Sequence, residues 1–334
     1  MTAPFRFADQ DEFPHRPDSS VNFNESVYMN AFDPGQRLGG WMRLGNRVNE
    51  GYAELSVCLY LPDGRIACQF QRPKIGANDK FEGGGLRYAV AEPTRRMSMR
   101  YDGEVFVLDD PNLLRQPETM FARAQRVPAS VEWNASAQSP IHGGEPLSAD
   151  TPTMYGRDFS LGHFNQHIAV EGALQVGDQR WPLHAFGWRD HSWGPRYWQV
   201  IYWYRLFLAN FGDGRGFMLL KIATPDGHSR RVGVLMVDGR YEDITDMDVI
   251  TDWSAEQDPQ RVRLNVRTAT RAEVIDGRVL SLAPLRNRRK ADGKVLVSRV
   301  AEGFTEFTWD GKTGYGMCEY IERIEDGRPV GFPH

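Results

Sequence analysis

The sequence predicts an all-β protein, and three observations support this fold class. The dipeptide Asp-Gly occurs nine times in the 334 residues. It is the strongest short-range signal for a tight hairpin, because both residues tolerate the positive φ angles of such a turn. Most of these dipeptides separate segments in which apolar and polar residues alternate, which is the pattern of antiparallel strands. Helical patterns are scarce along the chain.

Hairpins are expected in order along the chain wherever such a turn joins two alternating segments. Residues 53–71 form one hairpin around Pro-Asp-Gly, and residues 230–244 and 272–285 form two more around Asp-Gly. The helical exception is the segment 110–126, where Pro117 interrupts the apolar pattern and limits it to short helical turns.

Two glycine- or proline-rich segments are expected to be loops. The segment 136–153 is rich in Ser, Pro and Gly and predicts a surface loop. The sequence GDGRG at 212–216 lacks the Lys-Ser/Thr of a phosphate-binding loop, so it predicts a hairpin turn.

Composition is ordinary for a globular protein, with 41% hydrophobic and 25% charged residues. The formal net charge of −4 argues against a nucleic-acid partner, because binding to phosphates favours a basic surface. A chain of 334 residues exceeds what one small core usually organises. We therefore expect an N-terminal arm over residues 1–20, one domain over 21–196 and a second over 197–334, in a monomer or homodimer.

The cysteines and the N-terminus bear on the cellular compartment. Cys58, Cys68 and Cys318 form no CxxC pair, so neither a disulfide framework nor a zinc knuckle is indicated. Free thiols are typical of the reducing cytoplasm, where we expect the protein. The N-terminal residues lack the pattern of a signal peptide, and no run of about 18 apolar residues occurs, so we expect no stable membrane insertion.

The most unusual stretch covers residues 186–206, which hold four tryptophans and three tyrosines around one aspartate. Alternation predicts a strand up to Asp190, with Phe186 and Trp188 on the same face as this acid. His191 falls on the opposite face. Rings are favoured in strands and often simply fill a barrel interior, so a core role is one interpretation.

A second strand is predicted over 196–208, after a turn at 192–195. Its alternation places Trp198, Tyr202 and Tyr204 on one face.

The other interpretation of the aromatic run is chemical. Burial against apolar surface raises the pKa of an aspartic acid such as Asp190, so that it can donate a proton near neutral pH. Protonating an alkene or expelling a hydroxyl creates a carbocation, which aromatic faces stabilise by about 0.5–2 kcal/mol per ring. Asp190 is the candidate proton donor, and His163 and His191 would orient the acid or a water molecule. The candidate substrate-binding rings are Phe186, Trp188, Trp193, Trp198, Tyr202 and Tyr204.

Other titratable residues are weaker candidates. Glu25 and Glu319 lie in predicted strands near the two ends of the chain and could supply a second acid, although ion pairing with arginine is a common role for such residues. The histidines at positions 163, 167, 184 and 191 could line a barrel. Without an HExxH motif or a carboxylate pair, we expect no metal. The basic stretch 285–294 is interpreted as a solvated hairpin tip, with an anionic partner as the alternative.

The octapeptide RDHSWGPR at 189–196 resembles the signature of the carotenoid 1,2-hydratase/AttH-like superfamily. The resemblance extends over most of the chain, through the segments 23–33, 84–103, 163–187 and 314–320. It implies two lipocalin-like antiparallel β-barrels in tandem. It also implies that Trp188, Asp190 and His191 form the segment of the proton donor, supported by His163. Asn165 stands where the superfamily has a tryptophan, which argues against a carotenoid substrate.

The resemblance further implies the class of reaction. We expect a hydratase or dehydratase (a lyase), an isomerase or a cyclase that works by acid catalysis and without a cofactor on a hydrophobic small molecule. Terpene and other isoprenoid, steroid and polyketide-like skeletons all fit this description. The alternative is a non-catalytic binding protein for a hydrophobic small molecule, and a third interpretation is a structural protein with filled barrels. An open apolar pocket containing Asp190 would favour the enzyme.

Overall fold

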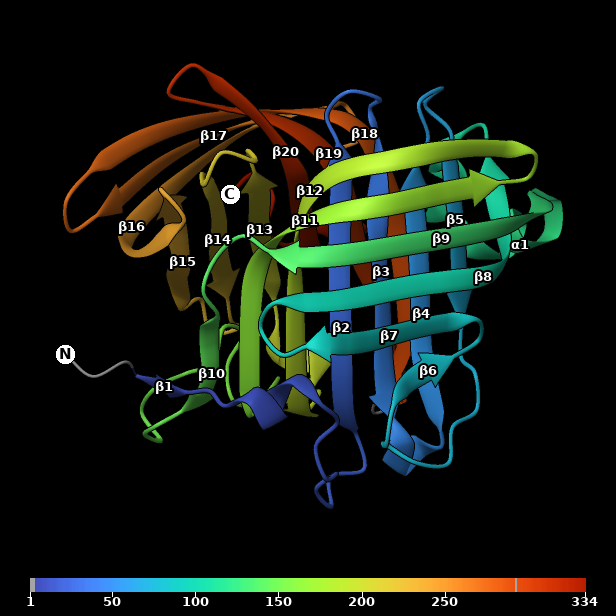
Figure 1. Cartoon of the computed structure of the whole chain (residues 1–334), viewed down its shortest axis with the longest axis horizontal. Helices are drawn as coiled ribbons and strands as arrows, with labels where there is room; N and C mark the ends of the chain where they lie inside the picture. Colours follow the sequence, from blue (N-terminus) through green and yellow to red (C-terminus); the bar gives the residue numbers. More distant parts are fainter. Residues whose placement is uncertain (1–3, 292) are drawn as a thin grey trace. The chain divides into compact units, whose positions relative to one another are not determined.

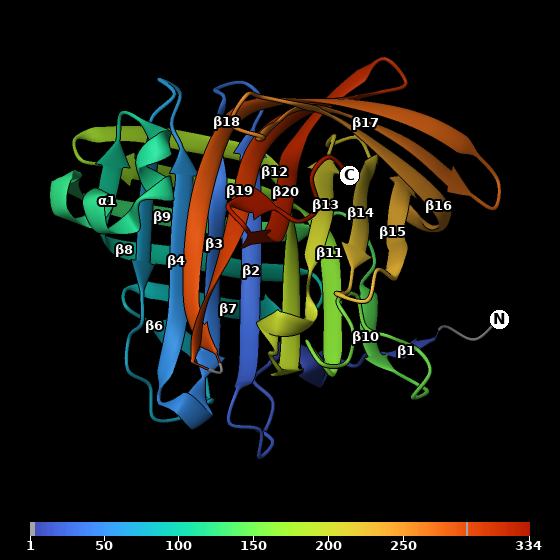
Figure 2. The same ribbon diagram turned by 180° about the vertical axis from the view of Figure 1, so that it is seen from behind.

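The computed structural model describes residues 4–291 and 293–334, and β-strands dominate it (Figures 1 and 2). The all-β prediction is therefore confirmed. The chain divides into two compact units, and most of the first unit precedes most of the second in sequence. The first holds the chain up to Leu61, Ala67–Val107 and Gln125–Trp198, and the second holds Pro62–Ile66, Leu108–Ala124 and Gln199–His334.

The first unit contains a sheet that closes into an antiparallel barrel. The order β11-β12-β2-β3-β4-β5-β8 is completed by β9, which pairs with both β8 and β11. The barrel strands are β2 (Phe23–Asp33), β3 (Leu38–Arg47), β4 (Tyr52–Tyr60), β5 (Ile66–Gln71), β8 (Arg96–Leu108), β9 (Gln125–Ala137), β11 (Gly162–Val176) and β12 (Gln179–Pro195). The shorter strands of the sheet are β1 (Phe5–Arg6), β6 (Phe81–Gly83), β7 (Leu86–Glu92) and β10 (His142–Pro146).

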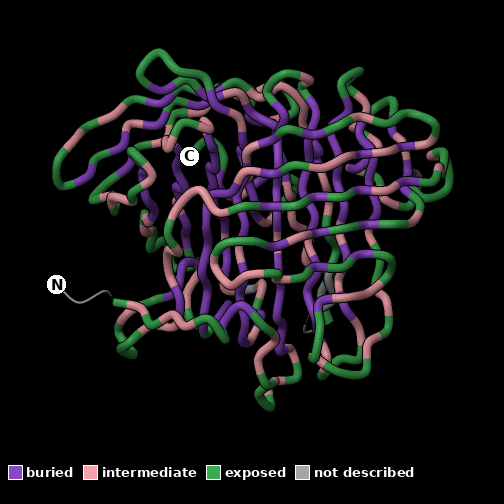
Figure 3. Tube along the Cα trace, in the orientation of Figure 1, coloured by how far each residue is buried: buried purple, intermediate pink, exposed green. Residues whose placement is uncertain are grey.

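The strands of this unit form two layers that cross at a steep angle. In Figure 1, β7, β8, β9 and the joined ends of β11 and β12 run across β2, β3 and β4, an arrangement typical of orthogonal sheet packing. Alternate residues of each strand fill the space between the layers, among them the buried Val27, Met29, Ile168 and Ala185. Figure 3 shows the buried stretches of the strands in purple. These positions define the interior face of the barrel.

The second unit is also a closed antiparallel barrel. Strands β13 to β20 pair in sequence order, and β20 pairs with β13 as well as with β19. The strands are β13 (Trp203–Asn210), β14 (Gly216–Ala223), β15 (Ser229–Val237), β16 (Arg240–Trp253), β17 (Pro259–Thr268), β18 (Ala272–Ala291), β19 (Lys294–Trp309), β20 (Lys312–Glu325) and an added edge strand β21 (Arg328–Pro329). The short helical turns predicted on either side of Pro117 are confirmed as a 3-10 turn at Pro111–Arg115 and α1 (Pro117–Arg123).

The predicted turns are confirmed at most Asp-Gly pairs. Turns between strands occur, with positive φ at the glycine, at Gly64, Gly214, Gly227, Gly239, Gly311 and Gly327. Two predicted turns are wrong, because Gly103 lies inside β8 and Gly277 lies inside β18. A Cβ at Gly277 would lie 2.7 Å from Phe307 and from Val262, so this glycine serves packing rather than a turn. Asp292, from the remaining pair, lies outside the described residues.

Two further expectations about local structure are wrong. The predicted turn at 192–195 is the end of β12, and the next strand begins only at Trp203, after a 3-10 turn at Trp198–Val200. The backbone N–H groups of Arg196 and Tyr197 donate to loop carbonyls, which keeps this stretch out of a sheet. The predicted loop 136–153 contains β10, which pairs with β11.

The three cysteines are buried and none of them is part of a disulfide. Burial raises the pKa of the Cys68 thiol to about 12 and raises that of Cys318 as well. Among the described residues, no helix is long and apolar enough to span a bilayer.

Candidate functional site

Strand β12 carries the predicted acid and sorts its neighbours onto two faces. Ala185 belongs to the interior core, so alternation directs His191 and Trp193 into the barrel. Trp188 and Asp190 share the outer face of β12; the sequence predicted that they share a face but not on which side of the barrel that face lies. His191 is therefore separated from Asp190 by the thickness of the strand, although the two residues are adjacent in sequence.

Asp190 is paired with His163 on the outer face. The Oδ2 atom of Asp190 lies 3.6 Å from Nε2 of His163, and the two side chains are 15% and 1% exposed. This distance is longer than a hydrogen bond. Both ring nitrogens of His163 are buried without a hydrogen-bond partner among the described residues. Antiparallel pairing of β11 with β12 produces the contact, because it sets Asn165 opposite Asp190 and His163 opposite Ser192.

Aromatic residues from β2, β3 and β12 lie on the same face as the acid. Tyr28 of β2 stands opposite Asp190 in the strand register. Its ring centroid lies 6.0 Å from that of Trp188, in an edge-to-face arrangement, and 6.2 Å from that of Trp41 on β3, which it stacks against. The indole N–H groups of Trp41 and Trp188 are buried without a hydrogen-bond acceptor among the described residues. Asn165 likewise has a buried side-chain oxygen without a donor.

No lysine or arginine of the described chain lies within ion-pair distance of Asp190. Arg189, its neighbour in sequence, points into the barrel. Arg196 donates instead to the Ser192 hydroxyl at 2.7 Å and lies over the Phe159 ring, 4.0 Å from its centroid. Burial, together with repulsion from Arg43, lowers the pKa of Arg196 to about 9.

A second cluster occupies the interior face at the end of the barrel where β2 begins. Glu25 lies between two imidazoles, with its Oε1 atom 2.6 Å from Nδ1 of His15 and 2.8 Å from Nε2 of His191. Asn78 donates to the other oxygen at 2.5 Å, and the backbone N–H of His15 also donates to this carboxylate. The His15 ring stacks on Trp193 with centroids 3.9 Å apart.

These contacts fix the protonation of Glu25. Burial alone would raise the pKa of Glu25, but the hydrogen bonds from His15 and His191 lower it to about 2. Although burial opposes a charge on His15, its bonds to Glu25 and Asp11 raise the pKa of this histidine. Glu25 is thus a carboxylate at neutral pH, which suits a proton acceptor rather than the second proton donor suggested by the sequence.

The same three side chains have the composition of a metal site. His15, Glu25 and His191 each offer one ligand atom, and these atoms lie within 4.8 Å of one another. The oxygens of Glu25 already accept hydrogen bonds from both histidines and from Asn78. The hydrogen bonds to Glu25 tie the N-terminal segment to β2 and β12, while Nε2 of His15 and Nδ1 of His191 are buried without a hydrogen-bond partner among the described residues. The four histidines that the sequence singled out do not form a comparable group among the described residues.

A buried ion pair fastens the N-terminal segment at a second point. Both terminal nitrogens of Arg189 donate to the Glu12 carboxylate at 2.7 Å, and both side chains are at most 1% exposed. Gln166 and Tyr88 supply the remaining acceptors. These contacts attach the N-terminal segment firmly to the interior of the first barrel.

The other predicted site residues lie elsewhere in the fold. Trp198 follows β12 and packs edge-on against Phe159, with centroids 5.0 Å apart. Phe186 is half-buried on the outer face of β12. Tyr202, Tyr204 and Glu319 belong to the second unit.

The second unit contains an acid that the sequence did not reveal. The Tyr204 hydroxyl donates to the Glu319 carboxylate, and Glu302 stands opposite Glu319 in the register of β19 and β20. Burial raises the pKa of Glu302, and the charge of Glu319 raises it further. In the sequence, Glu302 looks like an ordinary charged residue of a strand, because the sequence does not show which residue of the neighbouring strand lies opposite it.

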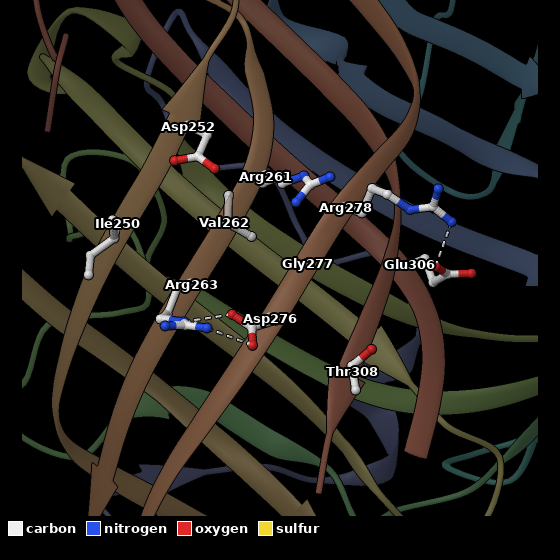
Figure 4. A pocket seen from close by; sticks show the side chains of 10 residues that line it. All are labelled: Ile250, Asp252, Arg261, Val262, Arg263, Asp276, Gly277, Arg278, Glu306 and Thr308. Atoms are coloured by element: carbon white, nitrogen blue, oxygen red, sulfur yellow. Dashed lines mark hydrogen bonds and ion pairs between the residues drawn. The ribbon is translucent and has the colours of Figure 1, made fainter. Parts of the chain in front are cut away.

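Two recesses in the second unit are charged rather than apolar. One, of about 740 Å³, lies over β16 to β19, and Figure 4 shows that its walls carry the ion pairs Arg263–Asp276 and Arg278–Glu306. The other, of about 390 Å³, is lined by Arg115, Arg286 and Arg288 among others. Neither contains Asp190, so the apolar pocket that the sequence analysis used as a discriminator is not one of these two.

The sequence from residue 8 to residue 324 matches the model of one protein family, described as a domain of unknown function, DUF7064. The chain belongs to the DUF7064 family. No curated protein matches it.

Solved structures share the fold of this DUF7064 chain at low sequence identity. A protein described as an AttH from Nitrosomonas europaea is 16% identical over 96% of this chain and 97% of its own, with a TM-score of 0.66. CghA with Sch210972 is 13% identical over 98% of both chains (TM-score 0.56), and kievitone hydratase from Nectria haematococca is 9% identical over 96% and 93% (TM-score 0.55). The likeness to these structures confirms the predicted fold of two lipocalin-like antiparallel β-barrels in tandem.

The outer face of β12 in this DUF7064 chain carries the candidate proton donor. It combines an acid, an imidazole with free nitrogens and three rings, and it holds no guanidinium paired with the acid. Sequence reasoning found Asp190, His163 and Trp188. It missed Tyr28 and Trp41, which are ordinary aromatic residues of strands until the register brings them beside the acid.

Proposed function

We propose that this protein is an acid–base enzyme of the hydratase, dehydratase or isomerase kind that acts on a large apolar substrate, with Asp190 as proton donor. The observation that carries the proposal is the Asp190–His163 pair, which is largely buried among rings and free of a paired guanidinium. The hydratase named among the structures of the same fold supports the reaction class.

The chemistry follows from the positions of the groups. Protonated Asp190 transfers its proton to an alkene carbon, so that a C–H bond forms as the π bond breaks and a carbocation results. The faces of Tyr28, Trp41 and Trp188 stabilise this cation. Water then adds to the cation, and the proton that it loses passes through His163 to the Asp190 carboxylate, which restores the acid. The reverse sequence dehydrates an alcohol, and loss of a different proton isomerises the alkene.

The substrate in this proposal is an isoprenoid-, steroid- or polyketide-like molecule. Three rings on the outer face offer apolar area but few hydrogen-bonding groups, so the recognition of a hydrocarbon skeleton is favoured over that of a polar metabolite. Asn165, with its vacant carbonyl oxygen, is suited to bind one hydroxyl of such a skeleton.

The test is turnover of apolar alkenes and alcohols from a hydrophobic metabolite extract in isotope-labelled water. Mass spectrometry would detect the gain or loss of one water, or a change of retention without a change of mass. We expect Asp190→Asn to lower the turnover by about a hundredfold to ten-thousandfold, as is typical for loss of a general acid. His163→Gln should also slow the reaction, whereas the exposed Asp102→Asn serves as the matched control.

Binding separates the enzyme from a carrier. Quenching of tryptophan fluorescence would report ligand binding, and Asp190→Asn should bind the substrate while failing to convert it. Turnover that survives in Asp190→Asn contradicts the mechanism. Binding by the wild type with no conversion of any ligand favours the non-catalytic alternative.

A further inference from the structure

A small basic recess in the second unit has no role in the chemistry proposed for Asp190. It has a volume of about 390 Å³, and three arginines line it together with Glu256, the apolar residues Val297, Ile324 and Pro329, and others. Two of the arginines, Arg286 and Arg288, come from the basic stretch that the sequence analysis interpreted as a hairpin tip. We call this feature the arginine recess, defined by Arg115, Arg286 and Arg288.

Arg286 has no acidic partner among the described residues. Its guanidinium donates to the carbonyl of Leu285 at 3.2 Å and makes no ion pair. The side chain is half-buried, and burial together with repulsion from Arg115 and Arg299 lowers the pKa of Arg286 to about 10. The charges of Asp258 and Glu322 offset this only in part, so an added anion beside Arg286 would favour its charged form.

The nearby acids are already engaged by other groups. Asp258 pairs with Arg115 and lies 3.7 Å from Arg299. Glu322 is buried between Arg299 and Arg205 and also accepts the backbone N–H of Gly331. Neither acid makes an ion pair with Arg286.

The rim of the recess adds a further positive charge. Arg288 is 59% exposed, and its ion pair with the exposed Glu118 spans 3.7 Å, so this pair is weak in water. The only acid in the lining is the exposed Glu256. The lining therefore carries an excess of positive charge in a chain whose net charge is −4.

We propose that the arginine recess binds the phosphate group of a small molecule, held by Arg286 and Arg288. Guanidinium groups match phosphate oxygens with paired, charge-assisted hydrogen bonds. The volume is within the range of small-molecule sites, and the apolar residues beside the arginines suit a ligand with a short apolar part. This binding site is independent of the Asp190 site, and neither proposal depends on the other.

The test uses inorganic phosphate with the full-length protein at constant ionic strength, with chloride as the reference anion. We expect phosphate to raise the midpoint of thermal unfolding of the wild type, and calorimetry to show an affinity at least about tenfold weaker in Arg286→Gln. Arg278→Gln, which removes an arginine of the same strand that is paired outside the recess, should bind phosphate like the wild type.

The unliganded variant separates binding from folding. Because Arg286 is repelled by its neighbours, Arg286→Gln without phosphate should unfold at the same temperature as the wild type or at a higher one. Equal stabilisation of the wild type and Arg286→Gln by phosphate would overturn the proposal, and so would the absence of any phosphate effect in the wild type.

A phosphate could also be presented by a lipid surface. Sedimentation with phosphatidate vesicles, compared with phosphatidylcholine vesicles, distinguishes the two sources. A free ligand predicts Arg286-dependent binding of inorganic phosphate without co-sedimentation. Co-sedimentation with phosphatidate vesicles in the absence of phosphate binding would overturn the assignment to a free small molecule.

Discussion

Asp190 and His191 are neighbours in β12, and a shift of one position in the strand gives their side chains entirely different surroundings. The two residues are adjacent, yet alternation gives Asp190 an outer face with His163 and three rings, and gives His191 an interior place beside Glu25. Asp190 makes no ion pair with an arginine, although its charge acts on the nearby Arg196, whereas His191 bonds directly to the Glu25 carboxylate. Adjacent residues in a strand therefore need not share a function, even when a motif contains both.

The lowered pKa of Glu25 makes a prediction about stability. Because this pKa falls from 4.5 to about 2 on folding, the contribution of Glu25 is fully present above the unfolded value and is lost as the pH falls towards 2. A difference of this size corresponds to about 3 kcal/mol. We expect Glu25→Gln to lower the free energy of unfolding by about this amount at neutral pH, and to flatten the acid limb of the pH profile.

Urea unfolding over a pH series would measure this effect, with the exposed Glu104→Gln as the control. The raised pKa of His15 acts with the opposite sign, so its contribution is lost as the pH rises through that value. A Glu25→Gln profile with the same acid limb as the wild type would show that the carboxylate is not stabilised as described.

The sequence named Asp190 and His163 as candidates and placed Trp188 on the same face as the acid, but it did not reveal the other side chains of this region. Asp190, Trp188 and His163 follow from one motif and from alternation within single strands. Tyr28 and Trp41 depend on which residues of β2 and β3 stand opposite β12, and His15 depends on the path of the N-terminal segment. These are long-range properties that no local pattern records.

At the scale of the element, β12 depends on close approach to its neighbours. A Cβ at Gly187 would lie 1.9 Å from the carbonyl oxygen of Asn30 on β2, a distance that no side chain can occupy. The strand can therefore hold Asp190 beside Tyr28 only if position 187 carries no side chain.

Gly187→Ala is expected to force β12 away from β2 and to lower the free energy of unfolding by about 1–3 kcal/mol, as overpacking usually does. Gly76→Ala is the matched control, since a Cβ there meets nothing within 4 Å. Its effect should stay within about 0.5 kcal/mol. Chemical denaturation measures the free energy of unfolding of both variants. Equal values would mean that β12 and β2 can separate to admit the Cβ without loss of stability.

Turns were predicted correctly where the glycine adopts a positive φ angle, and wrongly where the glycine lies inside a strand and makes room for a neighbouring side chain. Asp276-Gly277 has the composition of a hairpin turn, yet Gly277 lies inside β18 and makes room for Phe307. Glycine is required in both situations, so composition alone does not distinguish them. The strand predicted directly after β12 was wrong for a related reason. The aromatic residues of this stretch favour a strand, but its backbone N–H groups donate hydrogen bonds to loop carbonyls.

At the scale of the whole molecule, buried contacts join parts of the chain that are distant in sequence. The clearest is the Glu12–Arg189 pair, which connects the N-terminal segment to β12 across 177 residues. The alternating segments showed that the chain is all-β, and the superfamily resemblance implied two barrels. Neither could show that the N-terminal segment supplies a counter-charge inside the first barrel.

Glu12→Gln should destabilise the protein strongly. Removing the carboxylate leaves Arg189 buried with only neutral acceptors, and breaking a buried pair in this way costs about 3–5 kcal/mol. Asp9→Asn, an exposed change in the same 3-10 turn, is the control. Differential scanning calorimetry should show a clearly lower unfolding temperature for Glu12→Gln, and no comparable change for Asp9→Asn. Comparable curves for the two variants would indicate that Arg189 finds another anion.

The burial of all three thiols has a practical consequence for studying either barrel. Cys58 and Cys68 belong to the first unit and Cys318 to the second, and alkylating reagents attack a thiolate only when the surrounding strands open. The rate at which a buried cysteine is alkylated therefore reports how often the surrounding barrel opens, and each unit has at least one such cysteine. Peptide mapping after timed exposure to iodoacetamide would measure the opening of each barrel separately. No cysteine would have to be introduced by mutation.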